Sequence, residues 1–234
     1  MKQKLILISM DAMIREEYRM FQSVPVGIDL AEKPLIGIVG GKDRKGAYQV
    51  MRAMVAQLAA NNCYTDVKFV FIYNGSDSAE QKEWECMKWF PHLWSEDKST
   101  RYLASNEVER GDIFYELANV LRVRTKEQGS GNGRTRRAEP HYVLFVSSPS
   151  LLEGEILTRY MYDPRPQYGM TTVLLAEYIE ELPNCCEDIV ELDSYDSSFY
   201  NLLDSENGRQ RVQFDEVTVK QLEKMGRYLA DIRV

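Results

Sequence analysis

Short apolar runs alternate along the chain with segments whose apolar residues recur at helical spacing. The densest runs are rich in β-branched and aromatic residues and have the length of buried strands, so they predict strands. They lie at positions 4–9, 35–39, 67–73, 142–146 and 170–176. Weaker patterns predict strands at 24–30, where Pro25 suits a sheet edge, and at 102–104, 189–192 and 211–214.

Helical periodicity and capping residues predict helices between these strands. They are expected at 14–21, 47–60, 79–90, 107–123 and 149–162. Asn106 is the predicted N-cap of the fourth helix and Ser148 that of the fifth. A short helical stretch is expected before Gly208, and a terminal helix follows a capping box formed by Thr218 and Gln221. Alternating strands and helices predict an α/β fold of three layers, with a mostly parallel sheet and helices on both faces. We expect residues 1–234 to form a single domain, with 1–23 as a lead-in strand and helix.

The segment 125–140 (TKEQGSGNGRTRRAEP) is rich in glycine, polar and charged residues, which predicts a flexible loop. Its glycines at 129, 131 and 133 follow a predicted helix and precede a predicted strand, the reverse of a dinucleotide-binding fingerprint. Basic residues cluster around it, namely Arg122, Arg124, Lys126, Arg134, Arg136 and Arg137. No aromatic residue interleaves them, so we interpret the cluster as a solvated loop, with contact to an acidic neighbouring domain as the alternative.

The segment 35–60 combines a predicted buried strand, a glycine-containing turn and a helix. Such a unit binds phosphate in nucleotide-binding proteins, because backbone N–H groups converge at the helix start. Gly41 and Gly46 have the spacing of a phosphate-binding loop, and Gly40 and Lys42 lie beside them. The motif requires lysine and then serine or threonine after the second glycine, but Ala47 and Tyr48 occupy these positions. We predict a vestigial phosphate loop.

A working NTPase also needs an acidic residue at the end of a strand to hold Mg²⁺. The strand 142–146 is followed by Ser147 and Ser148, so this group is missing as well. Lys42 or Lys45 can still attract a phosphate, although neither occupies the lysine position of the motif. We therefore predict no hydrolysis and no required cofactor, and leave bound but unhydrolysed nucleotide as an open alternative.

The three tryptophans fall within positions 84–94 (WECMKWFPHLW). This segment is either a helix end docked on the core or an exposed aromatic patch for a partner, and the sequence does not choose between the two. His92, in the same segment, has no catalytic partner nearby in sequence, so a structural hydrogen bond is the expectation.

Composition limits the possible partners. The chain has 234 residues, 44% of them hydrophobic and 28% charged, with a formal net charge of −7. The acidic balance argues against nucleic acid as the main partner. Four cysteines lack metal-binding spacing, so no metal site is expected. No apolar run approaches the roughly 20 residues that span a bilayer. We expect a soluble, cytoplasmic chain.

An ordered set of separated phrases resembles one protein family. They are PVGIDL at 25–30, GIVG at 37–40, QLAA at 57–60, WFPH at 89–92, PHYV at 140–143, LEGE at 152–155, YGMTTV at 168–173 and LP at 182–183. From about Phe21 to the C-terminus, the chain resembles the cytoplasmic segment that precedes the first ATPase module in the FtsK/SpoIIIE-type ATPases of type VII secretion systems (EssC/EccC-type).

The resemblance implies a degenerate P-loop domain of RecA/FtsK-like fold that does not hydrolyse ATP and acts through protein contacts in assembly or regulation of the secretion machine. The chain would be a fragment of a membrane-anchored ATPase at the cytoplasmic face of the membrane. The implied partners are neighbouring ATPase and stalk domains and other secretion subunits, within an oligomer and without nucleic acid. A nucleotide-sensing domain that binds ATP or ADP without hydrolysis and an accessory domain of a DNA translocase remain as alternatives.

Overall fold

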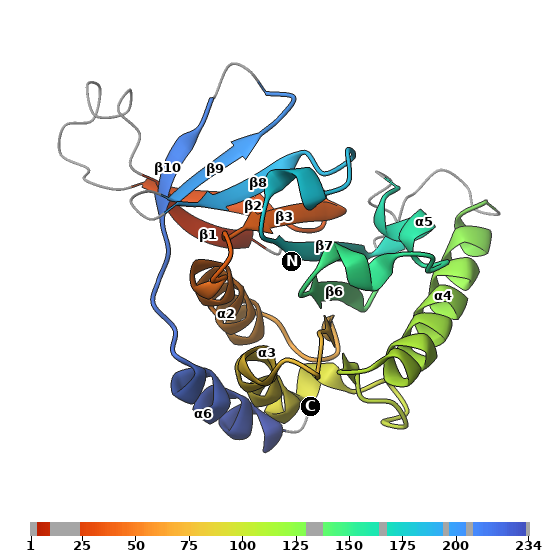
Figure 1. Ribbon diagram of the computed structural model, residues 1–234. Coiled ribbons are helices and arrows are strands. Elements are labelled where there is room, and N and C mark those ends of the chain that lie inside the picture. Colours follow the sequence, from red (N-terminus) through yellow and green to blue (C-terminus); the bar gives the residue numbers. More distant parts are fainter. Residues whose placement is uncertain are drawn as a thin grey trace.

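The structure is a computed structural model, and it describes residues 4–9, 24–129, 138–163, 168–193, 197–204 and 208–232. Its centre is a ten-stranded sheet with the order β2-β1-β10-β9-β8-β3-β7-β6-β4-β5 (Figure 1). The strands are β1 (Lys4–Ser9), β2 (Val24–Asp29), β3 (Leu35–Val39), β4 (Val67–Ile72), β5 (Leu103–Ala104), β6 (His141–Val146), β7 (Met170–Ala176), β8 (Asp188–Leu192), β9 (Ser197–Asn201) and β10 (Gln210–Gln213).

The sheet has a parallel part and an antiparallel extension. Strands β8, β3, β7, β6, β4 and β5 are parallel to one another. Strands β9, β10, β1 and β2 continue the sheet from β8 in antiparallel pairs. The strand that contains Pro25 is β2, which lies at an edge as predicted, because proline cannot donate a hydrogen bond to a neighbouring strand.

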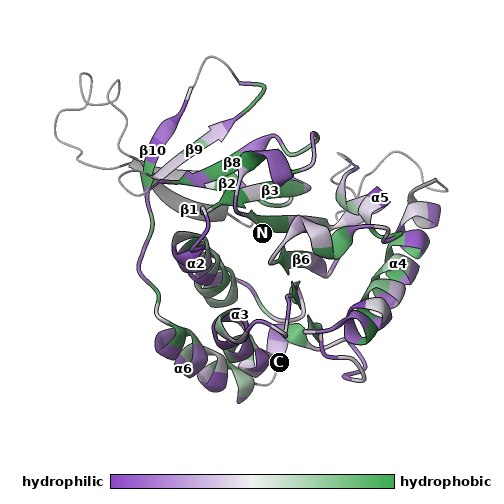
Figure 2. Cartoon of the chain, viewed as in Figure 1, coloured by the Kyte–Doolittle hydropathy of each residue, from purple (hydrophilic) through white to green (hydrophobic). Residues whose placement is uncertain are grey.

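Helices cover both faces of the parallel part (Figure 1). One face packs against α2 (Lys45–Asn61), α3 (Ser78–Trp84) and α6 (Val219–Ala230), and the other against α4 (Glu107–Gly129) and α5 (Thr158–Met161). Side chains of β3, β4, β6 and β7 are buried on both faces, which explains their nearly continuous apolar sequences (Figure 2). The predicted three-layer α/β fold is therefore confirmed.

Several local predictions are also confirmed. The capping box of α6 forms between Thr218 and Gln221. Asn106 accepts a hydrogen bond from the Glu109 amide at 3.0 Å and caps α4. The predicted helix 14–21 lies outside the described residues.

The helix predicted at 149–162 is wrong. Ser148 does accept a hydrogen bond from the Ser150 amide, but the structure that follows is a short 3-10 helix, η3 (Pro149–Leu152). Gly154 then adopts a φ of 77°, which takes the backbone out of the right-handed helical region. Helical structure resumes only in α5.

Two more boundaries need correction. Helix α4 continues to Gly129, because the first residues of the predicted loop 125–140 include the good helix formers lysine, glutamate and glutamine. Positions 130–137 lie outside the described residues. The region before Gly208, predicted as helical, contains strand β9, whose pairing with β8 and β10 outweighs its weak local preference.

Arg124 contradicts the interpretation of its basic cluster as a solvated loop. It is buried on α4, and its guanidinium donates to the carbonyl oxygens of Tyr168 and Pro140 at 2.8 and 2.7 Å. The same group lies over the ring of Tyr142, 5.1 Å from its centroid. Arg124 therefore fastens α4 to the amino ends of β6 and β7.

The tryptophan-rich segment docks on the core, the first of the two alternatives. Trp84 is fully buried, and the segment continues as η1 (Glu85–Trp89) and η2 (Pro91–Leu93), which α6 covers. His92 makes the expected structural hydrogen bond, from its Nε2 to the carbonyl oxygen of Asn62 at 3.1 Å. Burial lowers the pKa of His92 to about 4, so the ring is neutral at physiological pH.

Candidate functional site

The carboxyl ends of the parallel strands surround a pocket of about 450 Å³. In open α/β sheets, ligands bind at this edge. Its walls come from the turn between β3 and α2, the start of α3 and the segments after β4, β6 and β7. The lining residues are Lys42, Asp43, Arg44, Tyr48, Asn74, Asp77, Ala79, Glu80, Ser147, Ser148, Ser150, Leu151 and Glu177.

The glycine turn between β3 and α2 is held against the end of β7. The amides of Gly40 and Gly41 donate to the carbonyl oxygens of Ala176 and Glu177, both at 3.1 Å. Gly41 has a φ of 66°, a conformation that favours glycine. The Lys45 amide, at the start of α2, donates to the Asp43 carboxylate at 3.3 Å. These amides therefore already have acceptors within the protein.

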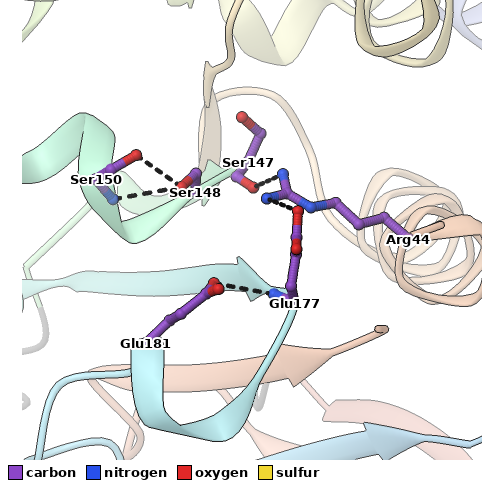
Figure 3. Close-up of polar contacts among 6 residues, drawn as sticks. All are labelled: Arg44, Ser147, Ser148, Ser150, Glu177 and Glu181. Atoms are coloured by element: carbon purple, nitrogen blue, oxygen red, sulfur yellow. Dashed lines mark hydrogen bonds and ion pairs between the residues drawn. The ribbon is translucent and has the colours of Figure 1, made fainter. Parts of the chain in front are cut away.

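Arg44 extends across the pocket from the N-terminus of α2 (Figure 3). Its Nη1 donates to the carbonyl oxygen of Ser147 at 2.8 Å, and its Nη2 lies 3.3 Å from Glu177 Oε1. Arg44 itself is in the left-handed region, with a φ of 49°. One side chain thus connects the start of α2 with the ends of β6 and β7, in the part of the fold where a phosphate-binding loop would hold phosphate.

Ala47 occupies the lysine position of the phosphate-loop motif and has no exposed surface. A Cβ built on Gly40 would lie 2.7 Å from the Ala47 Cβ, so the turn passes close to the first turn of the helix. This close approach depends on Gly40, which has no side chain. The helix start is packed closed around a small residue.

Tyr48 occupies the position of the magnesium-binding hydroxyl, but its ring turns into the core. It lies edge-on to Trp84, with 6.4 Å between ring centroids. Burial raises the pKa of Tyr48 to about 12, so the hydroxyl stays protonated. Burial also raises the pKa of Glu80, whereas nearby Ser147 and Arg44 act in the opposite direction.

Three of the four residues predicted for the vestigial loop, Gly40, Gly41 and Lys42, lie at or beside this pocket. Lys42 is exposed and lines it, and Gly40 and Gly41 form the turn. Gly46 sits instead against β8, where an added Cβ would lie 3.2 Å from Leu192 Cδ1. The sequence prediction considered Lys42 and Lys45 and missed Arg44, although Arg44 lies inside the motif.

No family model matches the chain. It is 28% identical over 178 residues to ESX secretion system protein YukB of Bacillus subtilis and, likewise, to ESX secretion system protein EccC of Geobacillus thermodenitrificans. Each alignment covers 76% of this chain and 11% of the relative. Type VII secretion system protein EssC of Staphylococcus aureus is 23% identical over 181 residues, with 76% and 12% covered. The chain matches one domain of the type VII secretion ATPases. It spans about a tenth of the length of these relatives.

Solved structures of type VII secretion ATPases share the fold. The cytoplasmic domain of the Thermomonospora curvata type VII secretion ATPase EccC superposes with a TM-score of 0.67 at 13% identity, over 98% of this chain and 30% of that one. ATPases 2 and 3 of Geobacillus thermodenitrificans EssC superpose with a TM-score of 0.67 at 10% identity, over 96% of this chain and 48% of that one. These likenesses confirm an ATPase-like fold. Within the described residues, no helix is long and apolar enough to cross a membrane.

Proposed function

We propose that this chain is a non-catalytic ATPase-like domain of a type VII secretion ATPase, and that it acts through protein contacts in assembly or regulation of the secretion machine. The observation that carries the proposal is the position of Arg44. Its guanidinium connects Ser147 and Glu177 across the pocket where a nucleotide phosphate would otherwise bind. Two substituted motif positions, Ala47 and Tyr48, give independent support.

The charge of the pocket supports the same proposal. Its lining includes four carboxylates, from Asp43, Asp77, Glu80 and Glu177, against two cations, from Lys42 and Arg44. A triphosphate carries several negative charges, and sites that bind it supply an excess of positive charge and free backbone amides. This pocket has the opposite balance.

The place of the domain in the full machine is part of the proposal. The domain would precede the first ATPase module of a membrane-anchored chain, at the cytoplasmic face of the membrane. It would contact neighbouring ATPase and stalk domains and other secretion subunits within an oligomer. The relatives support only the presence of neighbouring domains, because the match covers 11 to 12% of each of them.

A steady-state assay with ATP and Mg²⁺ tests the absence of hydrolysis. We expect turnover of the purified chain to equal that of a Gly46→Ala variant and of the control Gly111→Ala. Gly111 is an exposed glycine on α4, away from the pocket. Turnover that Gly46→Ala abolishes and Gly111→Ala preserves would contradict the proposal.

Nucleotide sensing without hydrolysis is the second candidate function. The observation in its favour is the pocket volume, which lies within the roughly 300–1,000 Å³ of small-molecule sites. Calorimetry with ATP and with ADP at millimolar concentration separates the two candidates. A saturable heat that Arg44→Glu changes would favour sensing, and no heat would remove it.

A further inference from the structure

Strand β4 carries one lysine among apolar residues, and this lysine is buried. Lys68 is the second residue of the strand and is 5% exposed. In the described parts of the chain it forms no hydrogen bond or ion pair, and its Nζ lies over the ring of Tyr64, 5.7 Å from the centroid. Lysine is almost never fully buried unless it is paired. Lys68 is therefore a buried cation without an anionic partner in this part of the protein.

Lys68 lines a second pocket, of about 460 Å³, at the amino end of β4. Among the described residues, the unpaired polar atoms that are sealed from solvent do not include Lys68 Nζ, so the ammonium group keeps accessible surface. A ligand in the pocket can thus reach it. The pocket around Arg44 lies at the opposite edge of the sheet, and the volume of the second pocket is also within the range of small-molecule sites.

Burial lowers the pKa of Lys68, and exposed Glu96 acts in the opposite direction without forming an ion pair in the described structure. Burial penalises the charged form of an amine, and a nearby negative charge favours it. A bound anion would therefore offset the cost of burying this ammonium group.

The lining of the second pocket indicates which anion fits. Its charged side chains are Lys68 and Lys98 against Glu96, which leaves one net positive charge. A carboxylate balances this charge, whereas a phosphate carries about two negative charges. The apolar and aromatic wall of the pocket comes from Tyr64, Pro91, Trp94 and Ile232. This wall suits an aromatic or aliphatic group attached to the carboxylate.

The loop 95–100 contributes to the rim of the pocket and is held by its own hydrogen bonds. The Asp97 carboxylate accepts from the hydroxyls of Ser95 and Ser99 at 2.6 and 2.8 Å. The Thr100 amide donates to Ser95 Oγ at 3.0 Å. This rim is therefore formed before a ligand binds, which reduces the entropy lost on binding.

We propose that the second pocket binds a carboxylate that carries an aromatic or aliphatic group, with the Lys68 ammonium group as its hydrogen-bond donor. The carboxylate belongs either to a free organic acid or to the carboxyl terminus of a peptide, because both present the same chemistry to Lys68. The inference goes beyond the proposed function and does not depend on it, since it uses the other edge of the sheet.

The ligand-side test uses the whole chain and four probes, with amide chemical shifts followed by NMR at millimolar concentrations. The probes are 3-phenylpropanoate as a free acid, N-acetyl-phenylalaninate as a peptide terminus, uncharged 3-phenylpropanamide and inorganic phosphate. We expect saturable shifts of the Lys68 and Trp94 amides with one or both carboxylates, and the tighter of the two identifies the source. We expect no such shifts with the amide or with phosphate.

Three results of this titration would overturn the inference. Equal binding of 3-phenylpropanamide would show that the charge of Lys68 contributes nothing. Equal binding of phosphate would show an anion site that makes no use of the apolar wall. With both carboxylates, an absence of saturable shifts at this pocket would show that it is not a carboxylate site.

A matched pair of variants tests the role of Lys68. Lys68→Met and Lys82→Met each remove one positive charge, but Lys82 is exposed on α3 and does not line this pocket. Methionine is unbranched and flexible, so it can fill the space of the buried lysine stem. Loss of a charge-assisted hydrogen bond should weaken binding of the tighter carboxylate about tenfold or more in Lys68→Met, with Lys82→Met unchanged. Equal affinity in the two variants would contradict the role of Lys68, and the titration of the wild type decides the inference if Lys68→Met does not fold.

Discussion

Arg44 joins the turn after β3 to the ends of β6 and β7. Two variants can separate the stability that its guanidinium contributes from the cost of its left-handed backbone. The side chain is 18% exposed, and its hydrogen bond and ion pair together support the closed pocket. We predict that Arg44→Ala lowers the free energy of unfolding by about 2 kcal/mol, measured by denaturant titration.

Arg44→Gly is the matched comparison, because a φ of 49° is strained for alanine and free for glycine. Both variants lose the guanidinium, so we expect Arg44→Gly to be about 1 kcal/mol more stable than Arg44→Ala. Equal stability of all three proteins would show that the guanidinium contributes nothing to the fold.

Arg124 gives a second prediction at the level of single residues. Arg124→Met removes a buried donor and leaves the carbonyl oxygens of Pro140, Tyr168 and Gly169 without this partner. We expect the free energy of unfolding to fall by about 3 kcal/mol. The control Arg122→Met changes an exposed residue of the same helix and should stay within about 0.5 kcal/mol of the wild type. Similar losses in both variants would contradict the contrast in burial.

Sequence patterns identify which groups the site lacks, but not what replaces them. The absence of lysine at Ala47 and of an acid at Ser147 can be read directly from the motif. The direction of the Arg44 side chain depends on a left-handed backbone at the helix start, and no local pattern specifies that conformation. The prediction for Arg124 was wrong for a similar reason. Composition identifies a basic cluster, but it does not show which arginine lies close to backbone carbonyl oxygens of other segments.

At the level of elements, the periodic segments were predictable because their burial repeats along the chain. Strand β7 and the apolar face of α2 are examples. The interruption of the helix predicted after Ser148 was not predictable, because it depends on the positive φ of one residue, Gly154. Strand β9 (SSFYN) contains no β-branched residue and exists through pairing with strands on either side.

The docking of α6 on η1 yields a prediction based on two helical glycines. An added Cβ at Gly226 would lie 3.1 Å from the Phe90 ring and from Trp89 Cβ, whereas Gly111 on α4 has open space. We expect Gly111→Ala to raise the free energy of unfolding by roughly 0.8 kcal/mol through helix propensity. Gly226→Leu should lower it by about 2 kcal/mol through overpacking. A Gly226→Leu protein as stable as the wild type would show that α6 does not pack as described.

At the level of the whole molecule, the sheet order places the N-terminal strands β1 and β2 beside β10, close to the end of the chain. Strands from the first and last parts of the sequence thereby belong to one sheet, and the helices on both faces pack against that same sheet (Figure 1). A sequence pattern predicts the alternation of strands and helices, but not this order, because the pairing of β1 with β10 joins segments about two hundred positions apart.

This arrangement predicts one cooperative unfolding transition for residues 1–234. All three tryptophans lie on the face covered by α3 and α6, so their fluorescence reports that layer alone, whereas far-UV circular dichroism reports every helix and strand. If the shared sheet couples the layers, the two signals should give the same midpoint and the same dependence on denaturant. Arg124→Met, which acts on the opposite face, should then shift the tryptophan transition as much as the circular dichroism transition. A shift seen only by circular dichroism would mean that the two faces unfold separately and that the chain contains two folding units.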